Sequence, residues 1–205
     1  LFGLWVAPGF SDSDHYMPYL QQGGLELPSR DYYLDDSEHM QQIRVKYAAH
    51  VAAMLRLVGF DDPEGRATRV IALEHSIAES HISLDEIEDI AKANNLWRRN
   101  DFSAKAPGLD WNAYFEGAGL GHQQEFIVWT PTAFTGESAL VASVPLDTWK
   151  DWLAFHLIES YAAFLPNAIE NEHFEFAGKI LGGIQQQSPW SERGIAVVND
   201  YLGDA

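Results

Sequence analysis

Residues 36–59 read DSEHMQQIRVKYAAHVAAMLRLVG, and this stretch decides the fold class. Its apolar side chains return every three or four residues, which is the spacing of one face of an α-helix. Gly59 then predicts the helix end, because glycine readily adopts the left-handed conformation that follows helices. The apolar face of this long predicted helix consists of Met40, Ile43, Tyr47, Val51, Met54, Leu55 and Val58.

Further helix starts follow along the chain. Residues 62–64, Asp-Pro-Glu, supply an N-cap acid, a proline at the first helical position and a second acid near the positive end of the helix dipole, so a helix is predicted to about His81. Residues 83–86 fit a capping box that begins a short helix towards Asn94. Another short helix is predicted at residues 111–115.

Residues 145–164 carry the strongest helical period in the chain. We expect Trp152 and Leu157 to be buried anchors of the core. The predicted apolar face consists of Trp149, Trp152, Leu153, His156, Leu157, Tyr161 and Phe164. Two more helices are predicted around Phe174 and after Pro189.

These elements predict a mainly α fold, a multi-helix bundle with one or two short β-strands near the N-terminus and around residues 125–130. Residues 1–205 are expected to form a single helical domain, with residues 98–110 as a polar loop. Leu1, Phe2, Leu4, Trp5 and Val6 should contact other elements, because large apolar groups are costly to leave in water. The expected partner strand is residues 126–129.

Composition excludes several classes of protein. The chain has 30 Asp and Glu against 13 Lys and Arg, and its formal net charge of -17 would repel the phosphates of nucleic acid. It has no cysteine, which excludes disulfides and thiolate sites. No stretch has the about 20 apolar residues that span a membrane. The opening LFGLWV shows no initiator methionine or signal sequence and suggests a segment of a larger protein.

The sequence contains no complete catalytic or metal-binding motif. His-Glu-x-x-His, which places two zinc-binding histidines one helical turn apart, is absent, as is the inverted motif. There is also no Gly-x-Ser-x-Gly nucleophile motif. A candidate set for a divalent ion remains, which we interpret as a solvated helix face with a chance acid–histidine pair. Its members are Glu74, His75, Glu79 and His81.

Other conspicuous residues have structural interpretations. His156 lies on an apolar helix face and is interpreted as a hydrogen-bonded core or boundary histidine. The pair Trp149 and Trp152 is interpreted as core packing. The glycines at 117–121 and 182–183 are interpreted as helix ends. No catalytic or metal-binding residue is therefore assigned, and substrate-binding residues stay unassigned.

Residues 22–34, QGGLELPSRDYYL, resemble the QGGLGLPDRDYYL signature of neprilysin-type (M13 family) zinc metallopeptidases, with differences at Glu26 and Ser29. Three further segments resemble the family in the same order, so the likeness spans nearly the whole chain. They are residues 47–59, residues 110–115 and residues 176–205. Residues 188–190, Ser-Pro-Trp, depart from the family's Pro-Arg-Trp.

The resemblance implies the noncatalytic N-terminal helical region of a zinc metalloendopeptidase, which faces the zinc domain across a closed chamber that admits peptides. The zinc ligands of the family lie after the point where this chain stops, so zinc is expected in the catalytic domain of the parent chain and no cofactor here. Expected partners are that domain and peptide substrates, and the parent is expected to be bacterial and extracytoplasmic. The fragment alone should be inactive.

Two alternatives stay open. The chain could be a standalone or degenerate peptide- or protein-binding helical module, or a helical metal-dependent enzyme that uses Glu74, His75 and Glu79. Within the signature, Arg30 and Asp31 are expected to fix a turn through an ion pair or backbone hydrogen bonds rather than to act on substrate.

Overall fold

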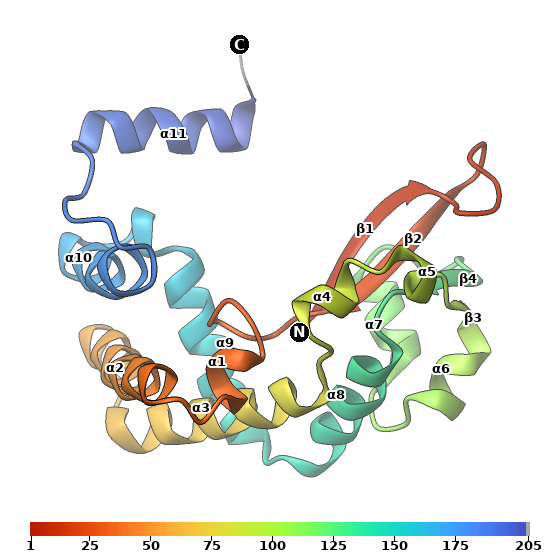
Figure 1. Ribbon diagram of the computed structural model, residues 1–205, viewed down its shortest axis with the longest axis horizontal. Coiled ribbons are helices and arrows are strands. Elements are labelled where there is room, and N and C mark those ends of the chain that lie inside the picture. Colours follow the sequence, from red (N-terminus) through yellow and green to blue (C-terminus); the bar gives the residue numbers. More distant parts are fainter. Residues whose placement is uncertain (204–205) are drawn as a thin grey trace.

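The structure is mainly helical, as predicted, with a small mixed sheet on one side (Figure 1). It is a computed structural model that describes residues 1–203. The longer helices are α2 (Glu38–Leu57), α3 (Pro63–Ser80), α8 (Pro131–Ser143), α9 (Leu146–Ser160) and α11 (Trp190–Leu202). The shorter ones are α1 (Asp31–Leu34), α4 (Leu84–Ile87), α5 (Ile90–Ala93), α6 (Arg99–Lys105), α7 (Trp111–Gly117), α10 (Asn167–His173), the 3₁₀ turn η1 (Ala162–Phe164) and the π-helix η2 (Phe174–Leu181).

The sheet has the strand order β1-β2-β4-β3. Its strands are β1 (Phe2–Pro8), β2 (Tyr16–Gln22), β3 (Leu96–Arg98) and β4 (Glu125–Val128). β1 and β2 form an antiparallel hairpin, β2 runs parallel to β4, and β3 is antiparallel to β4. The predicted pairing of the first residues with residues 126–129 is wrong, because the short polar turn lets β1 pair with its neighbour in sequence, and β2 then lies between β1 and β4.

The prediction that the first residues contact other elements is confirmed for Leu1, Phe2 and Trp5 and is wrong for Leu4 and Val6. The Phe2 ring stacks on that of Phe134 with centroids 4.2 Å apart, and the Trp5 ring stacks on that of Tyr19 at 5.4 Å. Leu4 and Val6 point away from this packing and are exposed. Trp5 and Ala7 lie on the covered face of β1 and Leu4 and Val6 on the opposite face, whereas Phe2, at the start of the strand, is covered on the side of Leu4 by α7 and α8.

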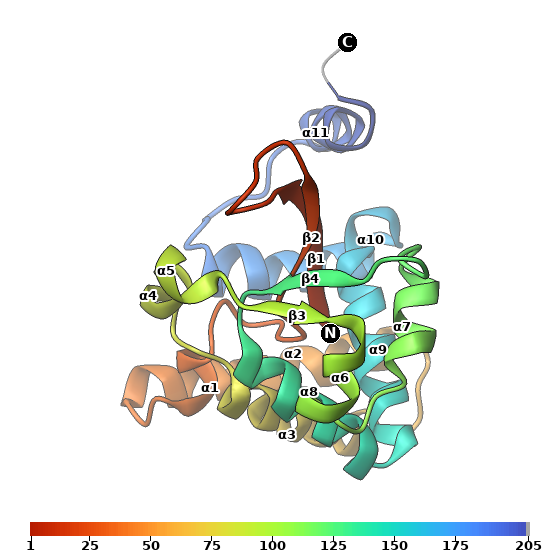
Figure 2. The ribbon, with the colours of Figure 1, turned by 90° about the vertical axis from the view of Figure 1, so that its right-hand side faces the viewer.

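Buried apolar side chains form two clusters, one among the helices α1, α2, α3, α9 and α10, and one between the sheet and α6, α7 and α8. Figure 2 shows these last three helices next to β3 and β4. Gln22, at the end of β2, links the segments between them. Its side-chain amide donates to the Ile82 carbonyl at 3.1 Å and accepts from the Ile82 N–H at 3.0 Å. Its backbone N–H donates to Thr130 Oγ1 at 2.7 Å. One glutamine therefore ties β2 to the segment after α3 and to the start of α8.

The predicted helix ends are confirmed. Gly59 follows α2 with a positive φ of 86°, and a cap that was not predicted is the Ser37 side chain, which accepts from the Met40 N–H at the start of α2. Asp62 caps α3 by accepting from the Gly65 N–H at 3.2 Å, with a proline at the first turn. The capping box at residues 83–86 is present. Local chemistry alone therefore placed these helix ends.

Two segments differ from prediction. Residues 98–110 are not a plain loop, because α6 forms there around the fully buried Phe102 and its start is held by Asp101, whose carboxylate accepts from the Arg98 N–H at 2.9 Å. The helix α8 was not predicted. It begins with a proline at the first turn and carries few charged groups, so it lacks the contrast between faces that reveals a surface helix.

The helix α9 is confirmed, but its buried face is rotated from the predicted one. Trp152 is only 8% exposed and its indole N–H donates to the Gly24 carbonyl at 3.1 Å, whereas Leu157 is 56% exposed. The prediction that Leu157 is a core anchor is wrong. The buried face of α9 instead includes two acids, which pair with charged groups on other helices. This face consists of Thr148, Asp151, Trp152, Phe155 and Glu159.

We expect Trp152→Ala to lower the free energy of unfolding by about 3–5 kcal/mol, through lost burial and the cavity left behind. Leu157→Ala, the matched control one and a half turns along the same helix, should cost less than about 1 kcal/mol because its side chain is already in water. Arg30→Ala should also stay near that lower value. Chemical denaturation of the three variants measures the order, and a loss at Leu157 equal to that at Trp152 would contradict it.

Candidate functional site

The sequence-derived metal candidates are not brought together. α3 places Glu74 in the core while the next residue, His75, points outward, because successive residues on a helix are about 100° apart. His75 Nδ1 lies 3.9 Å from Glu79 Oε1 on the surface, and His81 is buried elsewhere. The prediction that Glu74 and His81 lie on a solvated helix face is therefore wrong, because both side chains are buried. Within residues 1–203 no group of three or more His, Asp or Glu side chains is arranged to hold a metal ion.

Glu74 is instead the centre of a buried hydrogen-bond network. Its side chain is 0% exposed, and its Oε2 accepts from the Tyr47 hydroxyl at 2.6 Å and from the Tyr33 hydroxyl at 3.0 Å. Its Oε1 lies 2.7 Å from His156 Nε2. Tyr33 also accepts from the Leu27 N–H at 3.0 Å, so the signature segment is tied to the core through this carboxylate.

His156 is satisfied, as predicted, and it lies between two carboxylates. Its Nε2 faces Glu74, and its Nδ1 lies 3.3 Å from Glu26 Oε2. Burial of the imidazole disfavours the charge, but the hydrogen bonds to Glu26 and Glu74 outweigh it and raise the pKa of His156 to about 9. The imidazole is therefore protonated at neutral pH and neutralises the buried acid. Glu26, where the sequence departs from the common signature, contributes one of these contacts.

A second cluster of histidines and carboxylates joins α2, α9 and α10. His50 lies between Glu159, 3.2 Å from Nε2, and Glu172, 3.1 Å from Nδ1. His173 Nδ1 is 2.6 Å from the other oxygen of Glu159. Burial alone would raise the pKa of Glu159, but hydrogen bonds from His173 and His50 lower it to about 2. Glu159 is therefore ionised at neutral pH.

His81 and Glu137 form a third buried pair of a different kind. His81 Nε2 lies 3.1 Å from Glu137 Oε1, and Glu137 Oε2 has no hydrogen-bond partner among the described residues. Burial raises the pKa of Glu137 to about 9 and lowers the pKa of His81 to about 4. At neutral pH this pair is a protonated acid beside a neutral imidazole, not an ion pair.

The signature residues Arg30 and Asp31 do not form the expected ion pair. Among the described residues, no carboxylate lies within the 4.0 Å ion-pair distance of Arg30. The backbone carbonyl of Arg30 accepts from the Tyr33 and Leu34 N–H groups at 3.0 and 3.1 Å, and that of Asp31 accepts from Asp35 N–H at 2.9 Å. These are main-chain hydrogen bonds that form the turn of α1, and the Arg30 side chain does not cap it, so a turn-fixing role of the two side chains stays a prediction.

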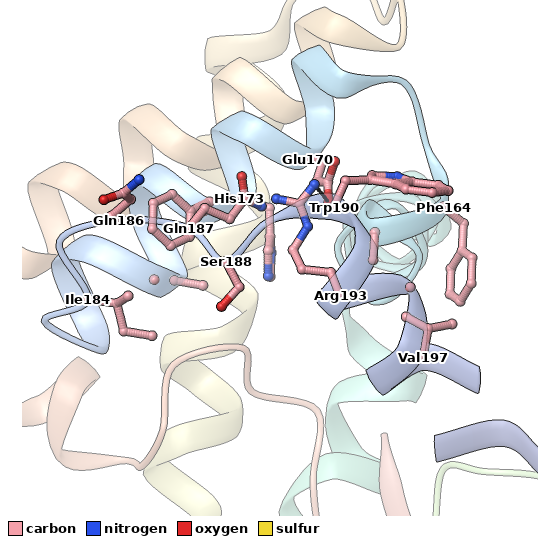
Figure 3. A pocket seen from close by; sticks show the side chains of 15 residues that line it. Phe164, Glu170, His173, Ile184, Gln186, Gln187, Ser188, Trp190, Arg193 and Val197 are labelled. Atoms are coloured by element: carbon pink, nitrogen blue, oxygen red, sulfur yellow. Dashed lines mark ion pairs between the residues drawn. The ribbon is translucent and has the colours of Figure 1, made fainter. Parts of the chain in front are cut away.

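A cavity of about 610 Å³ lies between the π-helix η2 and α11 (Figure 3). Its wall is mostly apolar, and Glu170 and Arg193 form an ion pair of 2.9 Å across it. His173 reaches the same wall from α10. The cavity has the size and lining of a small-ligand site, but it lacks an arrangement of nucleophile, base and metal ligands. Its apolar lining includes Phe164, Phe174, Ile184, Trp190 and Val197.

The buried acids on α9 were missed by sequence reasoning. Asp151 is buried where Arg66 and Arg69 of α3 pair with it, and Glu159 lies two turns further along the same face. Neither was included in the predicted buried face, which consisted of apolar residues and one histidine, because acids usually face water. A detectable signal existed: α3 carries two arginines one turn apart on one side, which is how a helix presents cations to a single buried carboxylate.

Comparison with known proteins identifies the family. The profile of Peptidase family M13 matches residues 1–205. This chain belongs to peptidase family M13. The cryo-EM structure of the zinc metalloprotease Zmp1 of Mycobacterium tuberculosis in its open state superposes with a TM-score of 0.93 at 30% identity, covering 98% of this chain and 32% of that one. PepO from Lactobacillus rhamnosis HN001 shares the fold, with a TM-score of 0.80 at 16% identity.

Curated relatives give the same assignment. Endothelin-converting enzyme-like 1 of Mus musculus is 24% identical over 192 residues, which are 91% of this chain and 25% of that protein. Neprilysin-3 of Drosophila melanogaster is 26% identical over 120 residues, or 58% of this chain and 15% of that protein. This M13 chain thus spans about a quarter of mouse endothelin-converting enzyme-like 1 and about a third of Zmp1.

The pKa of Glu137 gives a testable pH dependence. The folded state holds its proton up to about pH 9, whereas the unfolded state releases it near the ordinary value of 4.5. Between these values the folded state binds more protons, so its stability falls as pH rises, by up to about 1.4 kcal/mol per pH unit. We expect Glu137→Gln to flatten this slope and to be more stable than the parent at pH 8–9, with little difference near pH 4.5.

Thermal unfolding from pH 4.5 to 9 measures the effect, with the exposed Glu116→Gln as the control variant. His156 titrates in all three proteins, so the difference between their curves reports Glu137 together with the two groups that it acts on, the Leu1 amino group and Tyr114. Parallel curves for Glu137→Gln and the parent would show that this carboxyl group is already ionised at neutral pH.

Proposed function

We propose that this chain is the noncatalytic part of an M13 zinc metalloendopeptidase and forms a wall of the chamber in which peptides are hydrolysed. The observation that carries the proposal is the match to Zmp1: nearly all of this chain superposes on about a third of a zinc metalloprotease. The His-Glu-x-x-His motif is absent from the 205 residues, so the chain itself supplies no zinc site of that type. Zinc and the catalytic residues would belong to the rest of the parent protein.

An apolar stripe on the outer face of α9 supports the proposal that another part of the parent protein packs against this chain. Leu146, Leu153, Leu157 and Tyr161 recur at seven and four residues and are all at least half exposed. An apolar stripe left in water is unusual for a complete domain and common where another part of the same protein packs. We infer that the catalytic domain and other segments of the parent cover such faces, and that the parent is a bacterial extracytoplasmic protein.

The isolated chain is expected to cleave no peptide and to retain no stoichiometric zinc after dialysis. A quenched-fluorescence peptide assay and elemental analysis test this, with chelator-treated samples as the control. Turnover that disappears with chelator, or about one tightly held zinc ion per chain, would contradict it.

The native protein that carries this sequence should have a mass about three times the 23.0 kDa of the chain, since the chain covers 32% of Zmp1. Intact mass spectrometry of the protein from its source decides the point. A native mass near 23.0 kDa would favour the alternative, a standalone peptide- or protein-binding module.

No helix among residues 1–203 is long and apolar enough to cross a membrane.

A further inference from the structure

His50 is the best-enclosed imidazole of the protein, and it touches carboxylates on two different helices. It is 2% exposed on α2, and its ring stacks on Phe176 of η2 with centroids 4.6 Å apart. Nε2 faces Glu159 of α9 and Nδ1 faces Glu172 of α10. The ring therefore stands at the junction of all four elements.

With both acids ionised, this geometry is satisfied by a ring that carries a proton on each nitrogen. A neutral imidazole has one N–H donor and one lone pair, so it can donate to only one of two carboxylates. The protonated ring donates from both nitrogens and satisfies Glu159 and Glu172 together. Loss of the proton would leave a ring lone pair facing a carboxylate oxygen at about 3 Å, which is repulsive.

The same carboxylate binds a second histidine. Glu159 Oε1 lies 2.6 Å from His173 Nδ1, and this hydrogen bond, outweighing burial, raises the pKa of His173. Glu172 and His173, in the last turn of α10, thus each contact a residue of opposite charge on another helix. Glu172 contacts His50 of α2, and His173 contacts Glu159 of α9.

The surroundings offer no alternative cation. Among the described residues, no Lys or Arg lies within the 4.0 Å ion-pair distance of Glu159 or Glu172. Other charged groups facing the cluster are acidic or already paired. Glu26, from the segment before α1, and Glu170 of α10 act on His173, and Glu170 is itself paired with Arg193 of α11. His156 of α9 is held by Glu26 and by Glu74 of α3.

We propose that His50, Glu159, Glu172 and His173 form a proton-dependent latch that holds α10 and the π-helix η2 against α2 and α9. With both histidines protonated, two positive rings alternate with two carboxylates and the latch is closed. When the rings lose their protons, Glu172 is the first group released, because it is 30% exposed and His50 is its partner in the cluster. Glu159 stays buried.

Opening of the latch is local, because the apolar contacts of α10 and η2 with the helical core remain. Phe176 and Ile169 are buried against the helical core and do not titrate. The latch therefore governs how firmly residues 167–181 are held, and with them one wall of the cavity that η2 shares with α11. This inference is independent of the zinc chemistry of any parent protein.

Hydrogen–deuterium exchange of the protein, followed by mass spectrometry of peptides covering residues 167–181, tests the latch. After correction for the intrinsic pH dependence of exchange, protection of these amides should fall at least about tenfold from pH 5.5 to pH 9, while α3 changes little. Exchange of the histidine ring Cε1 hydrogens, measured on the same samples, reports the protonation of His50 and His173. The fall in protection should coincide with the titration of one of these rings.

Glu172→Gln is the informative variant, because its amide can donate to a neutral ring and accept from it. It should keep residues 167–181 protected across the whole range and remove most of the pH dependence. Glu175→Gln, which alters an exposed pair with Lys179 on η2, is the matched control and should behave as the parent. Unchanged protection in the parent from pH 5.5 to 9, an opening that does not follow either histidine, or a full pH response in Glu172→Gln would each overturn the proposal.

Discussion

The helical half of this protein depends on how it neutralises buried carboxylates. Glu74 and Glu159 lie inside the packing of α2, α3, α9 and α10, where an uncompensated charge costs several kcal/mol. Each is met by histidine, and Glu74 also by two tyrosine hydroxyls. The signature segment and α2 each bring a tyrosine hydroxyl to Glu74, and the orientation of α9 brings His156 to Glu74 and Glu159 to His173.

This constraint explains the signature segment without assigning it to catalysis. Residues 22–34 deliver Glu26 to His156 and the Tyr33 hydroxyl to Glu74, and their backbone builds the turn of α1. The Gly24 carbonyl accepts from the indole of Trp152. The signature residues Gly24 and Tyr33 therefore have structural partners in the core, whereas Glu26 is a position at which this chain departs from the common signature.

Much of the fold could be predicted from local sequence, but the networks could not. The caps at Asp62 and Ser83 and the stop at Gly59 predicted helix ends, and the spacing of Tyr47, Val51 and Leu55 predicted the buried face of α2, since these features depend on neighbours along the chain. The face of α9 was misjudged, because Asp151 and Glu159 enter the core only through partners on other helices. The same holds for β2, whose place between β1 and β4 depends on residues over 100 positions away.

The amide of Gln22 has a consequence for chemical durability. Both its atoms are used against one peptide unit: the nitrogen donates to the Ile82 carbonyl and the oxygen accepts from the Ile82 N–H. Hydrolysis of that side chain to a carboxylate would preserve its shape and its acceptor but remove its donor, leaving the Ile82 carbonyl facing negative charge. Replacement of one nitrogen by oxygen, without a change in side-chain size, would thus weaken the contact between β2 and the segment after α3. Slow deamidation of the stored protein would therefore destabilise the packing of the sheet against the helices at this position.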